Sequence, residues 1–257
     1  MIAAGIDIGT QSAKVAILKD GEVLSRSLAL CGFDPKEAAG QAFKEALKNA
    51  KLSFEKVEHI TATGAGAAKA PYSHSTISMM GADAQAGAYF FSSARTVIDV
   101  GAEEARAVSC DENGNMLNFV LNSRCAAGAG TFIEAMARAL EVELEELGPL
   151  SLKAEKASPI NASCVIFSES DVVSLIHRQE PKPEIARAIY DAMADRISSM
   201  AHRLGIKPHI VLVGGVAKDV GFVTSLKRKL GTELLIPEDP VFAGSVGAAL
   251  TASKRIR

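Results

Sequence analysis

The feature that most constrains the fold is a pattern of three strands that occurs twice. In each copy an apolar strand ends in Asp-x-Gly, and a second and third strand follow, joined by Asp20-Gly21 in the first copy and Asn113-Gly114 in the second. Such Xaa-Gly pairs are strong two-residue hairpin signals. The strands are expected at residues 2–8, 14–18 and 22–30, and again at residues 96–101, 105–109 and 116–121. Two copies in register predict a duplicated lobe.

Helical patterns and further strands follow each triple strand. Asp34-Pro35 is typical of a helix start, with an N-cap followed by proline at the first helical position, and this helix should run to about Lys51. Further helices are expected at about 130–141, 168–178, 183–204 and 244–253, and further strands at 57–61 and 209–213. This alternation predicts an α/β protein with helix-covered mixed sheets. We expect lobe I at residues 1–94 and lobe II at 95–257, with the last helix able to pack back on lobe I.

Composition narrows the class of protein. The 257 residues are 48% hydrophobic and 23% charged, with a net charge of -2 and no tryptophan. A nucleic-acid partner is not expected, because the basic excess of such proteins is missing. No stretch approaches the roughly 20 apolar residues of a membrane helix, and no secretory signal is recognisable, so we expect a cytoplasmic protein without a membrane partner.

The two Asp-x-Gly segments are candidate phosphate turns. Glycine lets backbone amides approach a phosphate, and the carboxylates of Asp7 and Asp99 can hold Mg²⁺ through water. A single copy would more simply be a capped turn, but the duplication favours a shared site for ATP or ADP. The candidate contacts are Gly9, Thr10, Gln11, Ser12 and Lys14 in the first turn, and Gly101, Ala102, Glu103 and Glu104 in the second.

Two more glycine segments are candidate nucleotide contacts. Gly214, Gly215 and Val216 follow an apolar strand and could let an adenosine lie flat on the backbone, although a plain strand-to-helix turn has the same pattern. Gly244 begins the last helix, where tight helix packing is the alternative. In this order the motifs resemble the actin, Hsp70 and sugar-kinase superfamily. The resemblance implies a ribonuclease H-like fold with two duplicated lobes around a nucleotide cleft, a fold that serves many functions.

Two of the four cysteines share one setting. Cys125 and Cys164 each precede a predicted helix, whose N-terminus stabilises a thiolate and suits an anionic metal cluster. A [4Fe-4S] cluster needs four thiolates, which a two-fold dimer would supply. Two unrelated buried cysteines are the alternative on spacing alone. Cys31 and Cys110 lie in strand or turn patterns and are expected to be inert, and the five histidines show no ligand spacing.

The segments 124–132 and 163–170 resemble the BadF/BadG/BcrA/BcrD ATPase family, which includes 2-hydroxyacyl-CoA dehydratase activators and benzoyl-CoA reductase ATPase subunits. The resemblance implies that Cys125 and Cys164 hold one [4Fe-4S] cluster between two subunits of a homodimer or heterodimer. It also implies an ATPase that drives electrons into a CoA-ester reductase or dehydratase. Gly128, Gly130 and Glu134 become nucleotide contacts, the last to the ribose, although Glu134 could instead pair with Arg138 on the helix surface.

One departure concerns the second turn. Activators usually have Asp-x-Gly-Gly-Gln-Asp-x-Lys, whereas this chain has Ala102-Glu103-Glu104 after Gly101, which looks more like the D-type benzoyl-CoA reductase subunit. Glu103 adds repulsion near a phosphate. Either Glu104 positions the attacking water, or this subunit hydrolyses ATP less well than its partner. A small sugar or amino-sugar kinase and an actin-like filament protein are the competing functions.

Overall fold

The computed structural model describes residues 1–122, 130–160 and 165–256. By its contacts the chain forms two compact units. Unit 1 contains Met1–Val97, Val108–Leu117 and Val241–Arg257, and unit 2 contains Ile98–Ala107 and Asn118–Pro240. The last helix therefore belongs to unit 1. These units are defined by contacts and do not test the predicted lobe boundary between residues 94 and 95, which stays a prediction.

Unit 1 is built on a five-stranded sheet with the order β3-β2-β1-β4-β5. β1 runs antiparallel to β2 and parallel to β4, so Asp7 lies opposite Lys14 on one side and Thr63 on the other. The predicted strands of the first copy are confirmed to within two residues. Their bounds are Ile2–Ile8 for β1, Ser12–Lys19 for β2, Glu22–Leu30 for β3, His59–Thr63 for β4 and Ser75–Thr76 for β5.

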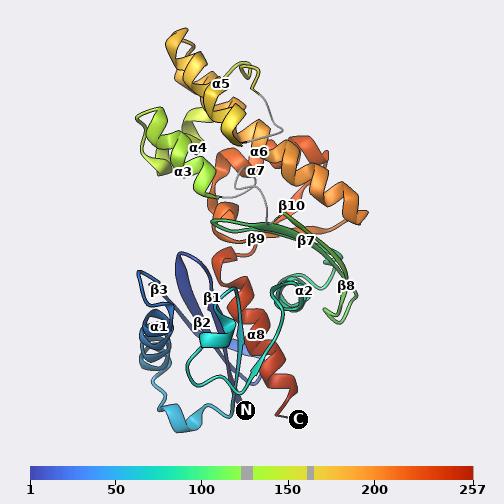
Figure 1. The fold of residues 1–257 in the computed structure, drawn as a ribbon. Helices are drawn as coiled ribbons and strands as arrows, with labels where there is room; N and C mark the ends of the chain where they lie inside the picture. Colours follow the sequence, from blue (N-terminus) through green and yellow to red (C-terminus); the bar gives the residue numbers. More distant parts are fainter. Residues whose placement is uncertain (123–129, 161–164, 257) are drawn as a thin grey trace. The chain divides into compact units, whose positions relative to one another are not determined.

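Helices cover both faces of this sheet (Figure 1). α1 (Pro35–Ala50) begins at Asp34, whose side chain accepts hydrogen bonds from two first-turn amides, and packs on the face that presents Ile6 and Ile8. α8 (Ala243–Lys254) packs on the other face and against α2 (Met79–Phe90). A Cβ on Gly5 would overlap the backbone of α8, so this residue sets how closely helix and sheet approach.

A second five-stranded sheet has the order β10-β9-β6-β7-β8. Its strands are β6 (Thr96–Val100), β7 (Ala105–Cys110), β8 (Met116–Asn122), β9 (Ile210–Val213) and β10 (Leu234–Leu235). The helices of unit 2 are α3 (Gly130–Ala139), α4 (Leu144–Ser151), α5 (Val165–His177), α6 (Lys182–Leu204) and α7 (Val220–Leu230). Both sheets are mixed and carry helices, as the sequence predicts for an α/β protein.

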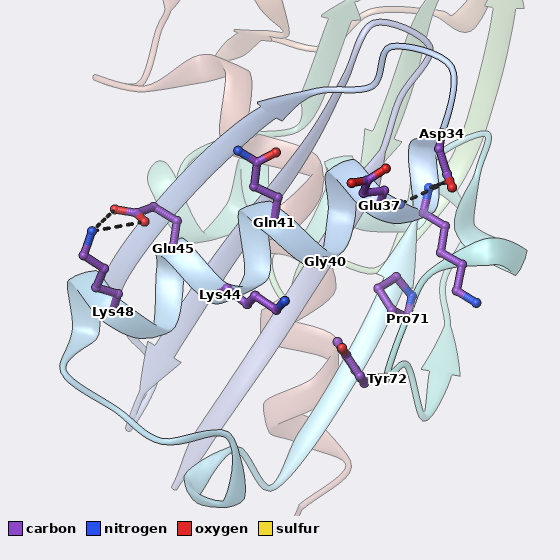
Figure 2. A pocket seen from close by; sticks show the side chains of 10 residues that line it. Asp34, Glu37, Gly40, Gln41, Lys44, Glu45, Lys48, Pro71 and Tyr72 are labelled. Atoms are coloured by element: carbon purple, nitrogen blue, oxygen red, sulfur yellow. Dashed lines mark hydrogen bonds and ion pairs between the residues drawn. The ribbon is translucent and has the colours of Figure 1, made fainter.

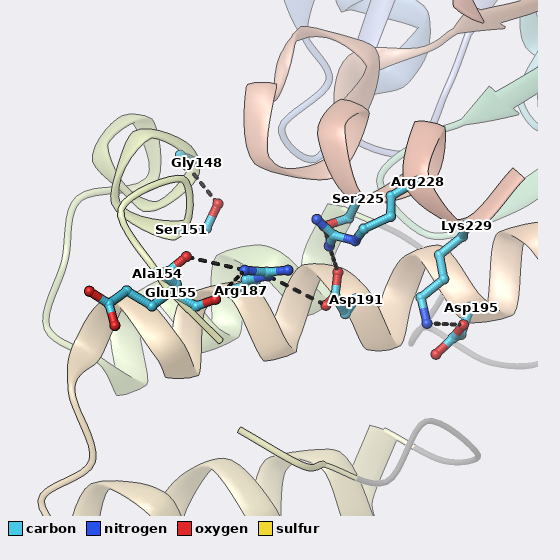
Figure 3. A network of polar contacts seen from close by, with 10 residues as sticks. All are labelled: Gly148, Ser151, Ala154, Glu155, Arg187, Asp191, Asp195, Ser225, Arg228 and Lys229. Atoms are coloured by element: carbon cyan, nitrogen blue, oxygen red, sulfur yellow. Dashed lines mark hydrogen bonds and ion pairs between the residues drawn. The ribbon is translucent and has the colours of Figure 1, made fainter. Parts of the chain in front are cut away.

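Charged contacts join α6 to its neighbours in unit 2 (Figure 3). Asp191 accepts from Arg228 of α7, and Asp195 pairs with Lys229 at 2.7 Å. Arg187 donates from α6 to the carbonyls of Ala154 and Glu155 at 3.1 and 3.2 Å. These pairs fix α6 between α7 and the segment after α4.

The two hairpins differ in their turns. Asp20 and Gly21 both have positive φ, as the predicted two-residue turn requires. In the second hairpin only Gly114 has a positive φ, and the Asp111 side chain accepts from the amides of Asn113 and Asn115. The second connection is thus a longer turn closed between Asp111 and Asn115, because Asn113 does not enter the left-handed region. In the described parts of the chain, no helix has the length and apolar character that crossing a membrane requires.

Candidate functional site

The first candidate phosphate turn joins β1 to β2 in unit 1. The Gly9 amide donates to the Ser12 carbonyl at 3.1 Å, which closes the turn and leaves Thr10 and Gln11 exposed at its tip. The Lys14 ammonium group donates to the same carbonyl at 3.3 Å and would lie 3.2 Å from a Cβ on Gly9. The structure thus places the lysine amine beside the backbone that a phosphate would contact.

Cys31 supports this turn, a role that the sequence analysis missed. Its amide donates to the Gln11 carbonyl at 2.9 Å, and its Sγ lies 3.5 Å from the Gly9 carbonyl. Burial raises the pKa of the Cys31 thiol, so the thiolate is disfavoured. Cys31 therefore contacts two carbonyls of the turn, and the inertness of its thiol stays a prediction.

Two glycines enclose the carboxylate of Asp7. A Cβ on Gly64, at the end of β4, would lie 2.5 Å from Asp7 Oδ1, and a Cβ on Gly244 would lie 2.7 Å from Asp7 Oδ2. Gly64 also has a φ of +92°, which side chains rarely adopt. Gly244, predicted as a nucleotide contact or a packing glycine, is buried and accommodates the carboxylate. The Gly64 contact depends on strand pairing, although Thr63-Gly64-Ala65-Gly66 is recognisable in the sequence as a glycine-rich strand end.

The second candidate phosphate turn joins β6 to β7 and has the same closing hydrogen bond. The Gly101 amide donates to the Glu104 carbonyl at 3.0 Å, and Glu103 is exposed at the tip. The buried Arg106 guanidinium pairs with Asp99 and donates to Glu104 Oε1 at 2.7 Å. Sequence reasoning did not assign Arg106, although its distance from Asp99 in the sequence equals that of Lys14 from Asp7.

The duplication extends to the glycine that contacts each aspartate. Gly214 follows β9 as Gly64 follows β4, and its φ of +91° is nearly that of Gly64. A Cβ on Gly214 would overlap Asp99 Oδ1 and the Val100 carbonyl, the same pair of contacts that a Cβ on Gly64 would make with Asp7 and Ile8. Each unit therefore holds its aspartate with an equivalent glycine turn.

The start of α3 is hydrogen-bonded to the second turn. The amides of Gly130 and Thr131 donate to the carbonyls of Gly101 and Ala102, both at 2.9 Å. A Cβ on Gly130 would lie 3.2 Å from the side chain of Val216, which is buried in the same core. Unit 2 thus brings together the second turn, the helix that carries the half-buried Glu134, and the predicted adenosine segment. Gly215 is exposed, and a Cβ placed on it would meet nothing within 4 Å.

Arg196 of α6 joins the two helices that follow the cysteine segments. Its guanidinium carbon lies 5.6 Å from the ring centroid of Phe132 on α3, and its Nη2 donates to the Ser168 hydroxyl on α5 at 2.8 Å. Both partners are buried. One side chain of α6 therefore contacts both α3 and α5.

The predicted cluster ligands Cys125 and Cys164, and Gly128, lie outside the described residues. Within residues 1–122, 130–160 and 165–256 no cluster of three or more His, Cys, Asp or Glu side chains forms a metal-binding group. Burial raises the pKa of Cys110, as it does for Cys31, and both are free thiols. His59 and His74 make local contacts in unit 1, with Ser75 and with the Ile60 amide.

A surface hollow lies along α1, and none of the residues that line it is a predicted site residue (Figure 2). Its walls include three acidic and three basic side chains together with Tyr72. The acidic residues are Asp34, Glu37 and Glu45, and the basic residues are Lys36, Lys44 and Lys48. The balanced charge gives this hollow no preference for an anionic nucleotide.

Comparison with known proteins agrees with the arrangement of motifs. A (R)-2-hydroxyglutaryl-CoA dehydratase activating ATPase of Acidaminococcus fermentans is 34% identical over 253 residues, covering 98% of this chain and 96% of that protein. A 2-hydroxyisocaproyl-CoA dehydratase activator of Clostridioides difficile is 32% identical, covering 98% and 95%. A benzoyl-CoA reductase subunit of Thauera aromatica is 31% identical, covering 99% and 94%.

Solved structures agree on the fold. The A. fermentans dehydratase component A has a TM-score of 0.94 at 33% identity, covering 99% of this chain and 98% of that chain. The C. difficile activator with bound ADPNP has a TM-score of 0.92 at 31% identity, covering 99% and 95%. A glucokinase of the ROK family from Streptomyces griseus, at 15% identity and a TM-score of 0.58 over 99% and 100%, shows the fold alone. These likenesses confirm the predicted fold of the actin, Hsp70 and sugar-kinase superfamily.

The family model for the BadF/BadG/BcrA/BcrD ATPases matches residues 4–252, nearly the whole chain. Together with relatives that are more than 30% identical over almost their full length, this match confirms the predicted family. The chain belongs to the BadF/BadG/BcrA/BcrD ATPase family.

Proposed function

We propose that this protein hydrolyses ATP to drive low-potential electrons, through a [4Fe-4S] cluster shared between two subunits, into an acyl-CoA dehydratase or reductase component. Membership of an ATPase family supports nucleotide binding, as does the bound ADPNP of a neighbour that is 31% identical. The names of the relatives, dehydratase activators and a reductase subunit, support a partner of that kind.

The observation that supports coupling best is the bonding of α3 to the second turn. Gly130 and Thr131 begin the helix directly after the Cys125 segment, and their amides donate to the carbonyls of that turn. A phosphate that repositions Gly101 and Ala102 would therefore move the start of α3. Through Arg196 the movement reaches α5, the helix that follows Cys164.

The residues around both turns fit a magnesium nucleotide. Gly9 and Gly101 keep side chains away from the turn backbone, and Asp7 and Asp99 supply the carboxylate oxygens that Mg²⁺ favours. When bound, Mg²⁺ neutralises phosphate charge. Lys14 would contact the terminal phosphate, Gly215 and Val216 the adenosine, and Glu134 the ribose.

Cys125 and Cys164 would supply two thiolates from each chain, which makes the dimer a requirement of the cluster. The cluster serves as a one-electron carrier. Full coupling to about 10 kcal/mol of hydrolysis free energy would change a one-electron potential by about 0.4 V, since about 59 mV corresponds to 1.4 kcal/mol. That is the scale that a difficult one-electron reduction of a thioester or aromatic ring needs.

Two versions of this function fit equally well. The activators and the reductase subunit are similarly related to this chain, at 32–34% and 31% identity. A dehydratase activator would purify as a homodimer, whereas a reductase subunit would co-purify with a related ATPase subunit. Anaerobic affinity purification from the native host, followed by mass spectrometry of the bound proteins, distinguishes them.

Asp7→Asn tests the nucleotide role. We expect the variant to keep its cluster spectrum but lose ATP-dependent electron transfer to an artificial acceptor, because the amide no longer holds the metal nucleotide. Asp20→Asn, at the exposed hairpin of the same unit, is the matched control and should retain wild-type turnover. Unchanged turnover in Asp7→Asn would refute the assignment.

A further inference from the structure

The two phosphate turns match residue by residue. Asp7-Ile-Gly-Thr-Gln-Ser-Ala-Lys14 aligns without a gap with Asp99-Val-Gly-Ala-Glu-Glu-Ala-Arg106. The alignment is also structural, because the Gly9 amide bonds to Ser12 at 3.1 Å and the Gly101 amide bonds to Glu104 at 3.0 Å. Each turn therefore provides an internal reference for the other. The first turn has a serine where the second has Glu104.

The basic residues of the two turns have different partners. Lys14 donates to a neutral carbonyl, that of Ser12. Arg106 instead pairs with Asp99 and, at 2.7 Å, with Glu104. The side chains of Arg106 and Asp99 are each only 10% exposed, so their pair is largely shielded from water. A guanidinium binds carboxylates and phosphates with the same N–H groups, which makes the two anions alternatives at one cation.

We infer that Glu104 is a built-in competitor of the nucleotide phosphate: it occupies the guanidinium of Arg106 until a phosphate displaces it, and so lowers the affinity of the second turn. This inference rests on the proposed ATP site. Glu104 is a positioning residue here, because it acts through Arg106. Its side chain is 32% exposed, so it can leave Arg106 for solvent without disturbing the core. Asp99 remains paired with Arg106 after the exchange.

The competition predicts opposite effects for the two partners. Glu104→Gln removes the competing charge and keeps the shape, so ADPNP should bind about tenfold more tightly. Arg106→Gln removes the shared cation, so ADPNP should bind about tenfold more weakly. In the double variant Glu104→Gln should give no gain, because its effect passes through Arg106.

The experiment is isothermal titration of the anaerobic holoprotein with Mg-ADPNP. If Arg106→Gln does not fold, Arg106→Lys replaces it. Lysine keeps the charge but cannot bind a carboxylate or phosphate with paired N–H groups, so the gain from Glu104→Gln should be smaller in this background than in wild type. If wild-type protein does not bind ADPNP, the proposed function fails and the inference with it. If wild-type protein binds and Glu104→Gln binds equally or more weakly, the inference alone is overturned. A gain that persists in the double variant would also overturn it.

Discussion

Gly214 and Gly215 are adjacent glycines with different structural roles, so alanine at each position gives a matched pair of variants. Gly214 has φ 91° and ψ 175°, a conformation that essentially only glycine adopts. An alanine Cβ there would also overlap Asp99 and the Val100 carbonyl. At Gly215 the same Cβ would meet nothing within 4 Å. One substitution should therefore affect folding and the other only the ligand surface.

The magnitudes follow from these contacts. For Gly214→Ala, backbone strain costs about 1–3 kcal/mol and overpacking about the same again, so the free energy of unfolding should fall by about 2–6 kcal/mol. For Gly215→Ala it should stay within about 1 kcal/mol of wild type or rise slightly, because alanine restricts the unfolded chain. If adenosine lies on this glycine, ADP affinity should fall by about 1–3 kcal/mol, which is roughly 5- to 150-fold.

Urea unfolding measures the first quantity, and isothermal titration with Mg-ADP under anaerobic conditions measures the second. A Gly214→Ala variant as stable as wild type would refute the contact between Gly214 and Asp99. A Gly215→Ala variant with wild-type ADP affinity would refute the placement of adenosine on Gly215. It would say nothing against the contact between Gly214 and Asp99, so the two measurements test the two glycines independently.

Three further perturbations test other parts of the structure. Tyr190→Phe removes the hydroxyl that donates to Asp219 at 2.6 Å and should lower the free energy of unfolding, measured by urea titration, by about 1–3 kcal/mol. Tyr89→Phe is the control and should change this free energy little, because the Tyr89 hydroxyl makes only a 3.5 Å hydrogen bond to Glu22. Burial raises the pKa of Asp219. The stability lost in Tyr190→Phe should be greatest at a pH above this pKa, because the hydroxyl stabilises the ionised carboxylate more than the protonated one. Burial lowers the pKa of His59, so the folded state favours the neutral imidazole. The free energy of unfolding should therefore fall as the pH drops below about 6.5, where the histidine of the unfolded chain becomes protonated. His59→Gln should reduce this pH dependence when thermal unfolding is measured across that range. Arg196→Met removes the contacts of Arg196 with Phe132 of α3 and Ser168 of α5. It should leave ADPNP affinity near wild type but slow ATP-dependent electron transfer roughly 2- to 30-fold in stopped-flow assays. A wild-type rate would contradict the proposed coupling of α3 to α5.

Much of the fold could be predicted because local signals agree with the tertiary structure. The six strands of the duplicated pattern appear within two residues of their expected bounds, since alternation and hairpin glycines define them locally. Asp34 caps α1 as its side chain and the following proline predict. The family could be recognised because the cysteine segments lie in local sequence.

Other elements had weaker signals. α2 is buried on more than one side, at Ala82, Asp83 and Gly87 among others. Its apolar residues therefore do not form one stripe, and the sequence lacks the 3.6-residue hydrophobic periodicity that would predict a helix. α4 contains Pro149, which argues against a helix interior. α7 was missed although Asp219 caps its start and Gly231 follows its end.

The missed parts of the site are mostly tertiary. Gly64 and Gly244 meet Asp7 only after β4 pairs with β1 and α8 packs on the sheet. Cys31 reaches the first turn from the end of β3, a contact that no spacing rule indicates. Arg106 was the exception, because aligning the two turns places it opposite Lys14.

We propose that this ATPase holds an iron-sulfur cluster through Cys125 and Cys164 of two subunits. Anaerobic purification followed by iron and acid-labile sulfide analysis tests it most directly, with Cys125→Ser and Cys164→Ser as matched variants. We expect a brown, oxygen-sensitive dimer with about four iron and about four sulfide per dimer, and neither in the variants. A colourless, metal-free wild-type protein in which an alkylating reagent modifies both thiols would contradict it.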